Sequence, residues 1–192
     1  MPVRRGRVPP AATINTARLL LRPFVVSDAQ RVAELAGAFE IADTTISIPH
    51  PYPPELAVEW IARHEQEPHR SRAVTLAVTV AASGVLGCVD LRDIDAEHAQ
   101  AELGFWIGKP YWGQGYATEA GAALLRFGYE SLDLNRVYAH HMVRNPASGR
   151  VLLKLGMRQE GLLRQRVRKW GRFEDVMAYA ALREDYRRQS RG

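Results

Sequence analysis

The stretch W-G-Q-G-Y-A-T-E-A, residues 112–120, sets two glycines one residue apart just before an alanine-rich segment. Glycine tolerates positive φ angles, so Gly113 and Gly115 permit a turn that most other residues avoid. Helical spacing begins directly afterwards and predicts a helix over 117–132. Because N–H groups at a helix start bind anions when no side chain obstructs them, the stretch indicates a phosphate-binding loop. The simpler alternative is a plain tight turn.

Two familiar nucleotide-binding patterns do not fit these residues. A Walker loop requires Gly-Lys-Ser/Thr, whereas Gly115 is followed by Tyr116 and Ala117. A dinucleotide fingerprint requires a third glycine or alanine at its set spacing inside a parallel strand–helix–strand unit. The runs before this loop are short and carry turn signals typical of antiparallel neighbours. The elements around the loop must therefore decide its ligand.

Hydrophobic periodicity divides the chain into strands and helices. Strands are predicted over residues 16–24, 73–81, 84–94, 101–107, 135–143, 159–169 and 174–182. Helices are predicted over residues 27–39, 55–67, 117–132 and 145–156. The order predicts an α+β fold class, a mixed and mostly antiparallel sheet of about seven strands flanked by about four helices.

Two of these helices carry clear end signals. The helix over 27–39 should begin at Ser27 or Asp28 as N-cap and place Phe39 on its apolar face. The helix over 145–156 has Asn145 as N-cap, Pro146 at its first position and Gly156 beyond its end.

Length and composition indicate one soluble domain. Residues 1–14 read as a basic, disordered arm without the apolar core of a secretory signal, and residues 187–192 as a basic tail. No apolar stretch approaches the roughly 20 residues that cross a bilayer. The single cysteine, Cys88, excludes an internal disulfide and fits a cytoplasmic location. Its apolar surroundings favour a buried side chain over a nucleophile.

The net charge of +5 is concentrated in the segment 158–172 and the C-terminal tail. Such patches suit phosphates, nucleic acid or an acidic partner. No zinc-finger spacing or recognisable nucleic-acid motif accompanies them, so a solvated, arginine-rich hairpin is the preferred interpretation and nucleic acid is not an expected partner. The six histidines form no metal-ligand set, and the adjacent His140 and His141 should be one packed and one exposed.

The motifs together resemble the GNAT superfamily of acetyl-CoA-dependent N-acetyltransferases. The loop is similar to the family's pyrophosphate motif Q/R-x-x-G-x-G/A, with Gly115 and Ala117 in its last two places and Trp112 in the first. The RimJ/RimL-like branch, named for ribosomal-protein N-terminal acetyltransferases, is resembled by the strings TARLLLRPF, ISIPHPYPPELAVEWI, GFWIGKPYWGQGYATEA and NPASGRVLLKLGM. The resemblance covers about residues 15–186.

This resemblance implies acetyl-CoA as co-substrate and no metal. The residues implied to bind it are Phe105, Trp106 and Ile107 through their main chain, Trp112, Gly113, Gln114, Gly115, Tyr116, Ala117 and Thr118 in the loop and helix start, and Asn145. The strand over 101–107 is implied to splay from the strand over 135–143, with the thioester in the gap. A main-chain N–H near Trp106 or Ile107 then stabilises the oxyanion.

The resemblance also ranks the side chains that assist chemistry. Glu102 occupies the place of a strand glutamate that acts as base in some members; the alternative is a surface carboxylate at a strand edge. The tyrosine that many members use to protonate the thiolate is replaced by Leu152, and Ser148 of the N-x-x-S pattern takes that role or is a plain first-turn residue. Lys109 stands where some relatives carry an acid, which departs from the pattern.

The acceptor is an amine, and free α-amines, with pKa values of about 7.7–8.0 against about 10.4 for lysine, suit a site with a weak base. A peptide N-terminus is therefore preferred. The same branch includes enzymes for antibiotics and polyamines, and a non-catalytic acyl-CoA-binding module is a further alternative. His50, Tyr52 and Trp60 are expected near the acceptor. A homodimer is one of the oligomeric states that the sequence allows.

Overall fold

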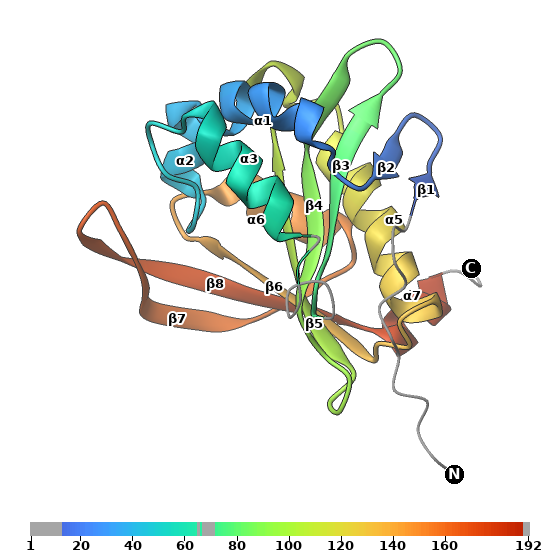
Figure 1. Ribbon diagram of the computed structural model, residues 1–192. Coiled ribbons are helices and arrows are strands. Elements are labelled where there is room, and N and C mark those ends of the chain that lie inside the picture. Colours follow the sequence, from blue (N-terminus) through green and yellow to red (C-terminus); the bar gives the residue numbers. More distant parts are fainter. Residues whose placement is uncertain (1–12, 65, 67–71, 190–192) are drawn as a thin grey trace.

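Eight strands form one mixed sheet in the computed structural model, which describes residues 13–64, 66 and 72–189 (Figure 1). Their order across the sheet is β1-β2-β3-β4-β5-β6-β8-β7. The strands are β1 (Ile14–Asn15), β2 (Leu20–Arg22), β3 (Val74–Val80), β4 (Gly84–Asp95), β5 (Gln100–Ile107), β6 (Arg136–Met142), β7 (Arg158–Lys169) and β8 (Arg172–Leu182). All neighbours are antiparallel except β5 and β6, which confirms the predicted mixed, mostly antiparallel sheet.

Helices cover both faces of this sheet. The α-helices in the described residues are α1 (Ala29–Ala36), α2 (Phe39–Thr44), α3 (Pro54–Arg63), α5 (Tyr116–Glu130), α6 (Pro146–Lys154) and α7 (Arg183–Gln189). In β3, Ala77 packs in a cluster with α1 and α3, whereas Leu76 and Val78 pack in a second cluster with α5 and α6. Successive strand residues point to opposite faces, so the two helix groups lie on opposite sides (Figure 1). None of the described helices is long and apolar enough to cross a membrane.

The parallel pair at the centre of the sheet is short. β5 and β6 pair only from Gln100–Arg136 to Glu102–Tyr138. Beyond Glu102, β5 continues along β4 to Ile107 while β6 continues along β8 to Met142. The two strands therefore separate, as the resemblance implied, and leave one edge of each without a strand partner.

Two main-chain hydrogen bonds show which residues of β5 face this gap. Ala99 O accepts from Arg136 N at 3.1 Å on the β6 side, and Gly108 N donates to Leu86 O at 2.8 Å on the β4 side. Main-chain groups of successive strand residues point to alternate edges. The N–H and C=O groups of Phe105 and Ile107 thus face the gap, whereas those of Trp106 face β4.

The N-terminal third differs most from the sequence expectation. The strand over 16–24 is reduced to β2, with a short β1 before it, because Thr16 and Leu19 close a turn between them. The helix over 27–39 ends at Ala36, since Gly37 and an extended Ala38 break it before α2 begins. Phe39 is consequently 55% exposed instead of lying on an apolar helix face.

The two chain ends and the cysteine complete the comparison. Ile14 of the expected arm lies in β1 and residues 187–189 of the expected tail end α7, which the sequence did not predict; residues 1–12 and 190–192 lie outside the described part. The side chain of Cys88 is buried, and burial raises the pKa of its thiol. The prediction that Cys88 is a buried apolar residue is confirmed.

Asp28 immediately precedes α1 but makes no side-chain cap bond to that helix. Its carboxylate instead accepts from Arg22 through two bonds, at 2.7 and 2.9 Å, and from Val25 N–H at 2.9 Å. Burial raises the pKa of Asp28, but the bonds from Arg22 and Val25 outweigh burial and leave the pKa lowered. The residue therefore joins the start of α1 to the end of β2.

Replacing this carboxylate should give a pH-dependent loss of stability. A pKa lowered in the fold means that ionised Asp28 stabilises the fold above its unfolded pKa of about 3.9, and that this contribution is lost as pH falls through the folded value. We expect Asp28→Asn to lower the free energy of unfolding in urea by about 2 kcal/mol at pH 7, and the difference from wild type to narrow towards pH ~3.

The exposed Glu97 in the turn between β4 and β5 provides the control, since Glu97→Gln should leave stability unchanged at both pH values. If the free energy of unfolding of Asp28→Asn stayed below that of wild type by the same amount at both pH values, the ion pair would be contradicted.

Candidate functional site

A cavity of about 840 Å³ opens where β5 and β6 separate. Residues 102–106 of β5 and 139–142 of β6 line it, together with α1, the connection from α2 to α3, α6 and β7. Of the expected catalytic and cofactor-binding residues, the cavity lining includes Glu102, Phe105, Trp106 and Ser148, whereas Ile107, residues 112–118 and Asn145 are outside it. Tyr52 and Trp60 also line the cavity. His50 bonds Gly37 O instead, at 2.8 Å.

The glycine loop lies at the start of α5. Gly113 and Gly115 adopt φ angles of 75° and 81°, so both positions need the freedom of glycine. Gly115 is the N-cap of α5, and no side chain in the described residues caps this helix. The N–H groups of Tyr116, Ala117 and Thr118 therefore begin the helix without an intrahelical acceptor. They form the kind of site that holds a phosphate.

Arg18 braces this loop from the N-terminal segment. Its Nη1 donates to Gln114 O at 3.0 Å, its Nε bonds Glu119 Oε2 at 2.6 Å, and its guanidinium lies 4.8 Å from the ring centre of Tyr116. Glu119 also accepts from Thr16 Oγ1 at 2.6 Å. Burial raises the pKa of Glu119, but these bonds outweigh it and the pKa is lowered. Arg18 thus neutralises a carboxylate that would otherwise repel an anion at the helix start.

Trp112, which stands in place of the family's Gln or Arg, ties the loop to β5. Its Nε1 donates to Ile107 O at 2.5 Å. This bond occupies the carbonyl of Ile107 on the gap side and leaves its N–H facing the gap. The indole is 48% exposed, so Trp112 contributes position rather than charge.

Glu102 is buried inside the cavity wall, with 7% of its surface exposed. Its Oε1 accepts from Arg92 Nη2 at 2.6 Å and lies 3.0 Å from His140 Nδ1. Arg92 Nη1 is also 3.7 Å from Asp90 Oδ1. Burial lowers the pKa of Arg92, but the two carboxylates outweigh it and the pKa is raised. Glu102 is therefore no surface carboxylate at a strand edge but the centre of a buried ionic cluster.

His140 gives this cluster a neutral base. Burial lowers its pKa, although the charge of Glu102 opposes the shift. A neutral ring that donates Nδ1–H to Glu102 keeps an unshared pair on Nε2. The expectation of one packed and one exposed histidine was wrong: both are half-buried and line the cavity, with His141 against Tyr179.

Asn145 and Ser148 form the start of α6. Asn145 Oδ1 accepts from Ser148 N at 3.3 Å, which confirms the predicted N-cap, and Asn145 Nδ2 donates to Ser148 Oγ at 3.0 Å. The serine oxygen thereby accepts from Asn145 and keeps its own O–H free to donate. Leu152, one turn later, is fully buried and also lines the cavity.

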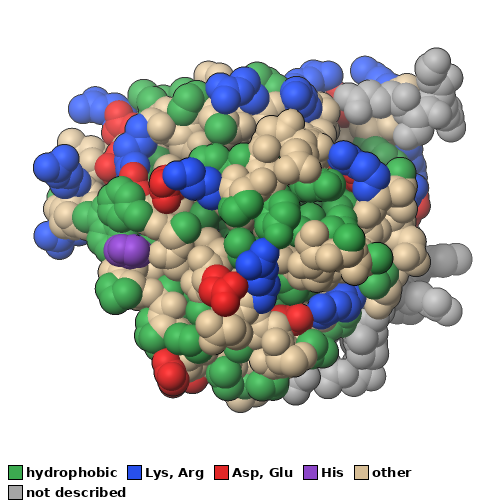
Figure 2. Space-filling view, turned by 90° about the horizontal axis from the view of Figure 1, so that it is seen from above, with side chains coloured by type: hydrophobic (Ala, Val, Ile, Leu, Met, Phe, Trp, Pro, Cys, Tyr) green, Lys and Arg blue, Asp and Glu red, His purple; other side chains and the backbone are tan. Residues whose placement is uncertain are grey.

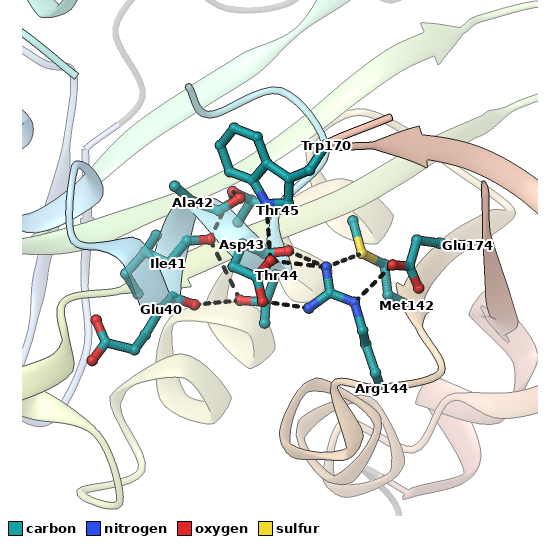
Figure 3. A network of polar contacts seen from close by, with 10 residues as sticks. All are labelled: Glu40, Ile41, Ala42, Asp43, Thr44, Thr45, Met142, Arg144, Trp170 and Glu174. Atoms are coloured by element: carbon teal, nitrogen blue, oxygen red, sulfur yellow. Dashed lines mark hydrogen bonds and ion pairs between the residues drawn. The ribbon is translucent and has the colours of Figure 1, made fainter. Parts of the chain in front are cut away.

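A polar network closes the cavity on the side of α2 (Figure 3). Arg144 lies between α2 and β8, where it pairs with Asp43 and with Glu174, the latter at 3.1 Å. Trp170 lies at the tip of the β7–β8 hairpin, and its Nε1 donates to Asp43 Oδ1 at 2.9 Å. Three segments far apart in the sequence meet at this carboxylate.

Lys169 reinforces the same junction. It is only 6% exposed, and its Nζ donates to Ile48 O at 2.8 Å. Burial lowers the pKa of this lysine, while Asp43 opposes the shift. The hairpin tip is thus held against residues 44–49, which form one wall of the cavity.

The basic segment 158–172 is partly neutralised in the fold. Arg158 pairs with Asp185 at 2.8 Å, and Glu160 of this segment pairs with Arg136. Seen from above, the molecule shows basic and acidic side chains interspersed around hydrophobic ones (Figure 2).

Sequence reasoning missed Arg92, the role of His140 and the junction at Arg144. A signal for the first was present: polar residues interrupt the apolar run of β4 at alternate positions, Asp90 and Arg92. Arg92 faces Glu102 in the β4–β5 register. The junction had no local signal, because its partners lie 30 and 101 residues from Arg144.

Comparison with known proteins identifies relatives of this chain. The model of the acetyltransferase (GNAT) domain family matches residues 18–158. The uncharacterized N-acetyltransferase p20 of Bacillus licheniformis is 37% identical over 102 residues, 53% of this chain and 57% of that protein. The uncharacterized N-acetyltransferase YnaD of Bacillus subtilis (strain 168) is 29% identical over 174 residues, 90% and 98% of the two chains.

Solved structures agree. The crystal structure of the acetyltransferase (GNAT family) from Bacillus anthracis superposes with a TM-score of 0.79 at 25% identity, over 90% of this chain and 99% of that one. The match to p20 spans little more than half the length of that relative.

The state of His140 can be measured directly. Because burial disfavours the charged ring, we expect its NMR titration to give a pKa below 6.5. Since the charge of Glu102 raises this pKa, Glu102→Gln should lower it further. A value above 6.5 in wild type, or a rise in Glu102→Gln, would contradict the arrangement of the cluster.

Proposed function

Because the chain belongs to the GNAT acetyltransferase family, we propose that it transfers the acetyl group of acetyl-CoA to a primary amine by direct attack in a ternary complex. The observation that carries this proposal is the gap between β5 and β6, which opens beside the uncapped start of α5. The cavity contains the buried cluster at Glu102, and the phosphate-type site lies at the start of α5, in the loop that follows β5. Holding two reactants side by side there supplies much of the rate.

The donor half would be bound mainly by main-chain groups. The loop and first turn from Trp112 to Thr118 would hold the pyrophosphate, with Gln114 and Tyr116 beside it. Phe105 and Ile107 present their main chain to the gap, where an extended amide chain can pair as an additional strand would. Acetyl-CoA would supply the activated thioester, and the Ile107 N–H, which faces the gap, would donate to the oxyanion. Trp106 would contribute its side chain, since its main chain faces β4.

Proton transfers would rest on two clusters. Glu102, through His140, would remove the proton of the attacking amine, because His140 is neutral near pH 7 and its Nε2 is an acceptor. Ser148 would donate a hydrogen bond to the leaving thiolate, while Asn145 orients its oxygen. Asn145 would combine this role with its N-cap bond.

For the acceptor we propose a protein or peptide N-terminal amine. A relative, the ribosomal-protein-serine acetyltransferase of Escherichia coli (strain K12), is 31% identical over 98 residues, 51% of this chain and 55% of that protein. Another, the spermidine N(1)-acetyltransferase of Vibrio cholerae, is 27% identical over 122 residues. A polyamine calls for an acidic channel, yet in the part of the chain that the structure describes the cavity lining has only two acids, Asp90 and Glu102, and both interact with Arg92. The helix acids Glu34, Glu40 and Asp43 are paired with basic residues and do not line the cavity.

The test is acetyl-CoA consumption with a panel of N-terminal peptides, amino acids, aminoglycosides and polyamines. We expect turnover on peptides with free α-amines and none on the same peptides after N-terminal blocking. Tight CoA binding without turnover on any acceptor would favour a non-catalytic acyl-CoA-binding module instead.

The loop assignment predicts the effect of a charge at Gly115. Gly115→Glu should weaken CoA binding roughly a hundredfold or more, measured by calorimetry, because like charges placed together cost several kcal/mol. The positive φ adds strain of about 1–2 kcal/mol. Gly171→Glu, at a φ of 78° in the β7–β8 turn, carries the same strain away from the loop and should bind CoA normally. Unchanged CoA affinity in Gly115→Glu would refute the loop assignment.

Ser148→Ala separates chemistry from binding. We expect kcat to fall about tenfold, the effect of losing one hydrogen bond to a charged group, while the KM for acetyl-CoA changes little. Ser131→Ala, at the exposed end of α5, is the control. Equal kcat in wild type and Ser148→Ala would show that Ser148 is only a first-turn helix residue with no role in the reaction.

A further inference from the structure

The charged side chains that line the cavity are of both signs. Asp90 and Glu102 supply the acids; Arg63, Arg92 and Arg166 supply the bases. Arg92 is committed to the two carboxylates, at 3.7 and 2.6 Å. With His140 neutral, this inner cluster carries a net negative charge, which suits the positive charge of a bound ammonium group.

The other two arginines lie at the walls of the same cavity. Arg166 belongs to β7 and Arg63 ends α3. Both side chains are exposed, and no carboxylate among the described residues forms a salt bridge with either. The charge of Arg166 reaches the inner cluster, since it is one of the groups that lower the pKa of His140 after burial and Arg92. The cavity is therefore lined by an anionic cluster and by two exposed arginines.

We propose that the acceptor carries a carboxylate close to its reactive amine, and that Arg166, assisted by Arg63, binds that carboxylate. This inference rests on the proposed amine acetyltransferase function and narrows it to acceptors that are zwitterionic near the reacting centre. Guanidinium groups bind carboxylates through two parallel hydrogen bonds, so an exposed arginine in the cavity wall can select for them. A polyamine would place its second cation against both arginines.

The carboxylate has two chemical sources, the acidic side chain of a peptide's second residue and the α-carboxylate of a free amino acid. Three C-terminally amidated peptides that differ only at position two, Ser-Glu, Ser-Gln and Ser-Lys, test the first source. Serine against serinamide tests the second. Acetylation is followed as kcat/KM for each acceptor, and calorimetry with the CoA complex measures acceptor binding independently of turnover.

We expect at least one acidic acceptor to exceed its neutral partner about tenfold in kcat/KM, the effect of a charge-assisted hydrogen bond. Arg166→Ala should reduce that ratio towards one by raising the KM of the acidic acceptor alone. Arg166→Glu should reverse the preference and favour the Ser-Lys peptide. Arg164→Ala, an exposed arginine of the same strand outside the cavity lining, should keep the wild-type ratio.

Two results would overturn the inference: equal use of acidic and neutral acceptors by wild type, or a preference that persists in both Arg166→Ala and Arg63→Ala. Turnover of every acceptor at equal rates would leave the acetyltransferase proposal intact. Absence of all turnover would end that proposal instead, and the calorimetric comparison of Ser-Glu with Ser-Gln would still decide whether the cavity selects a carboxylate.

Discussion

The separation of β5 from β6 after three residue pairs is the constraint on which the rest of the structure depends. A continuous parallel pairing would satisfy the main chain of Phe105 and Ile107 and leave no cavity. Each strand is instead held by its other neighbour, β5 by β4 and β6 by β8. The open edge is stable because it is short, and because helices from both layers close the space around it.

The loop before α5 and the cluster at Glu102 have different physical requirements. At the loop, the requirement is the absence of side chains, so that helix N–H groups stay accessible. At Glu102, the requirement is burial, which keeps His140 neutral although two carboxylates lie nearby. An arginine neutralises a carboxylate at each place. Arg18 pairs with Glu119 beside the loop, and Arg92 pairs with Glu102 in the cluster.

Local patterns were enough to predict most of the architecture. Alternation located β3 to β8 within about two residues, and Asn145 with Gly156 located α6. Gly113 and Gly115 predicted the turn whose positive φ angles the structure contains. What failed was decided by tertiary contacts: Asp28 bonds back to Arg22 instead of capping α1, and Phe39 starts a separate helix. His140 could not be ranked from sequence because its partner lies on a strand 38 residues away.

The junction at Asp43, where Arg144 and the hairpin tip meet α2, has a consequence for how such a protein changes over generations. In the proposed function, the donor side would be formed mainly by one contiguous stretch, residues 102–118, and by its main-chain groups. The acceptor side proposed here would be formed by the connection between α2 and α3 and by the β7–β8 hairpin, which are joined by contacts of Arg144, Lys169 and Trp170. Substitutions there can reshape one wall without disturbing the other. A lineage can thus exchange the molecule it modifies while keeping the acyl donor it has always used.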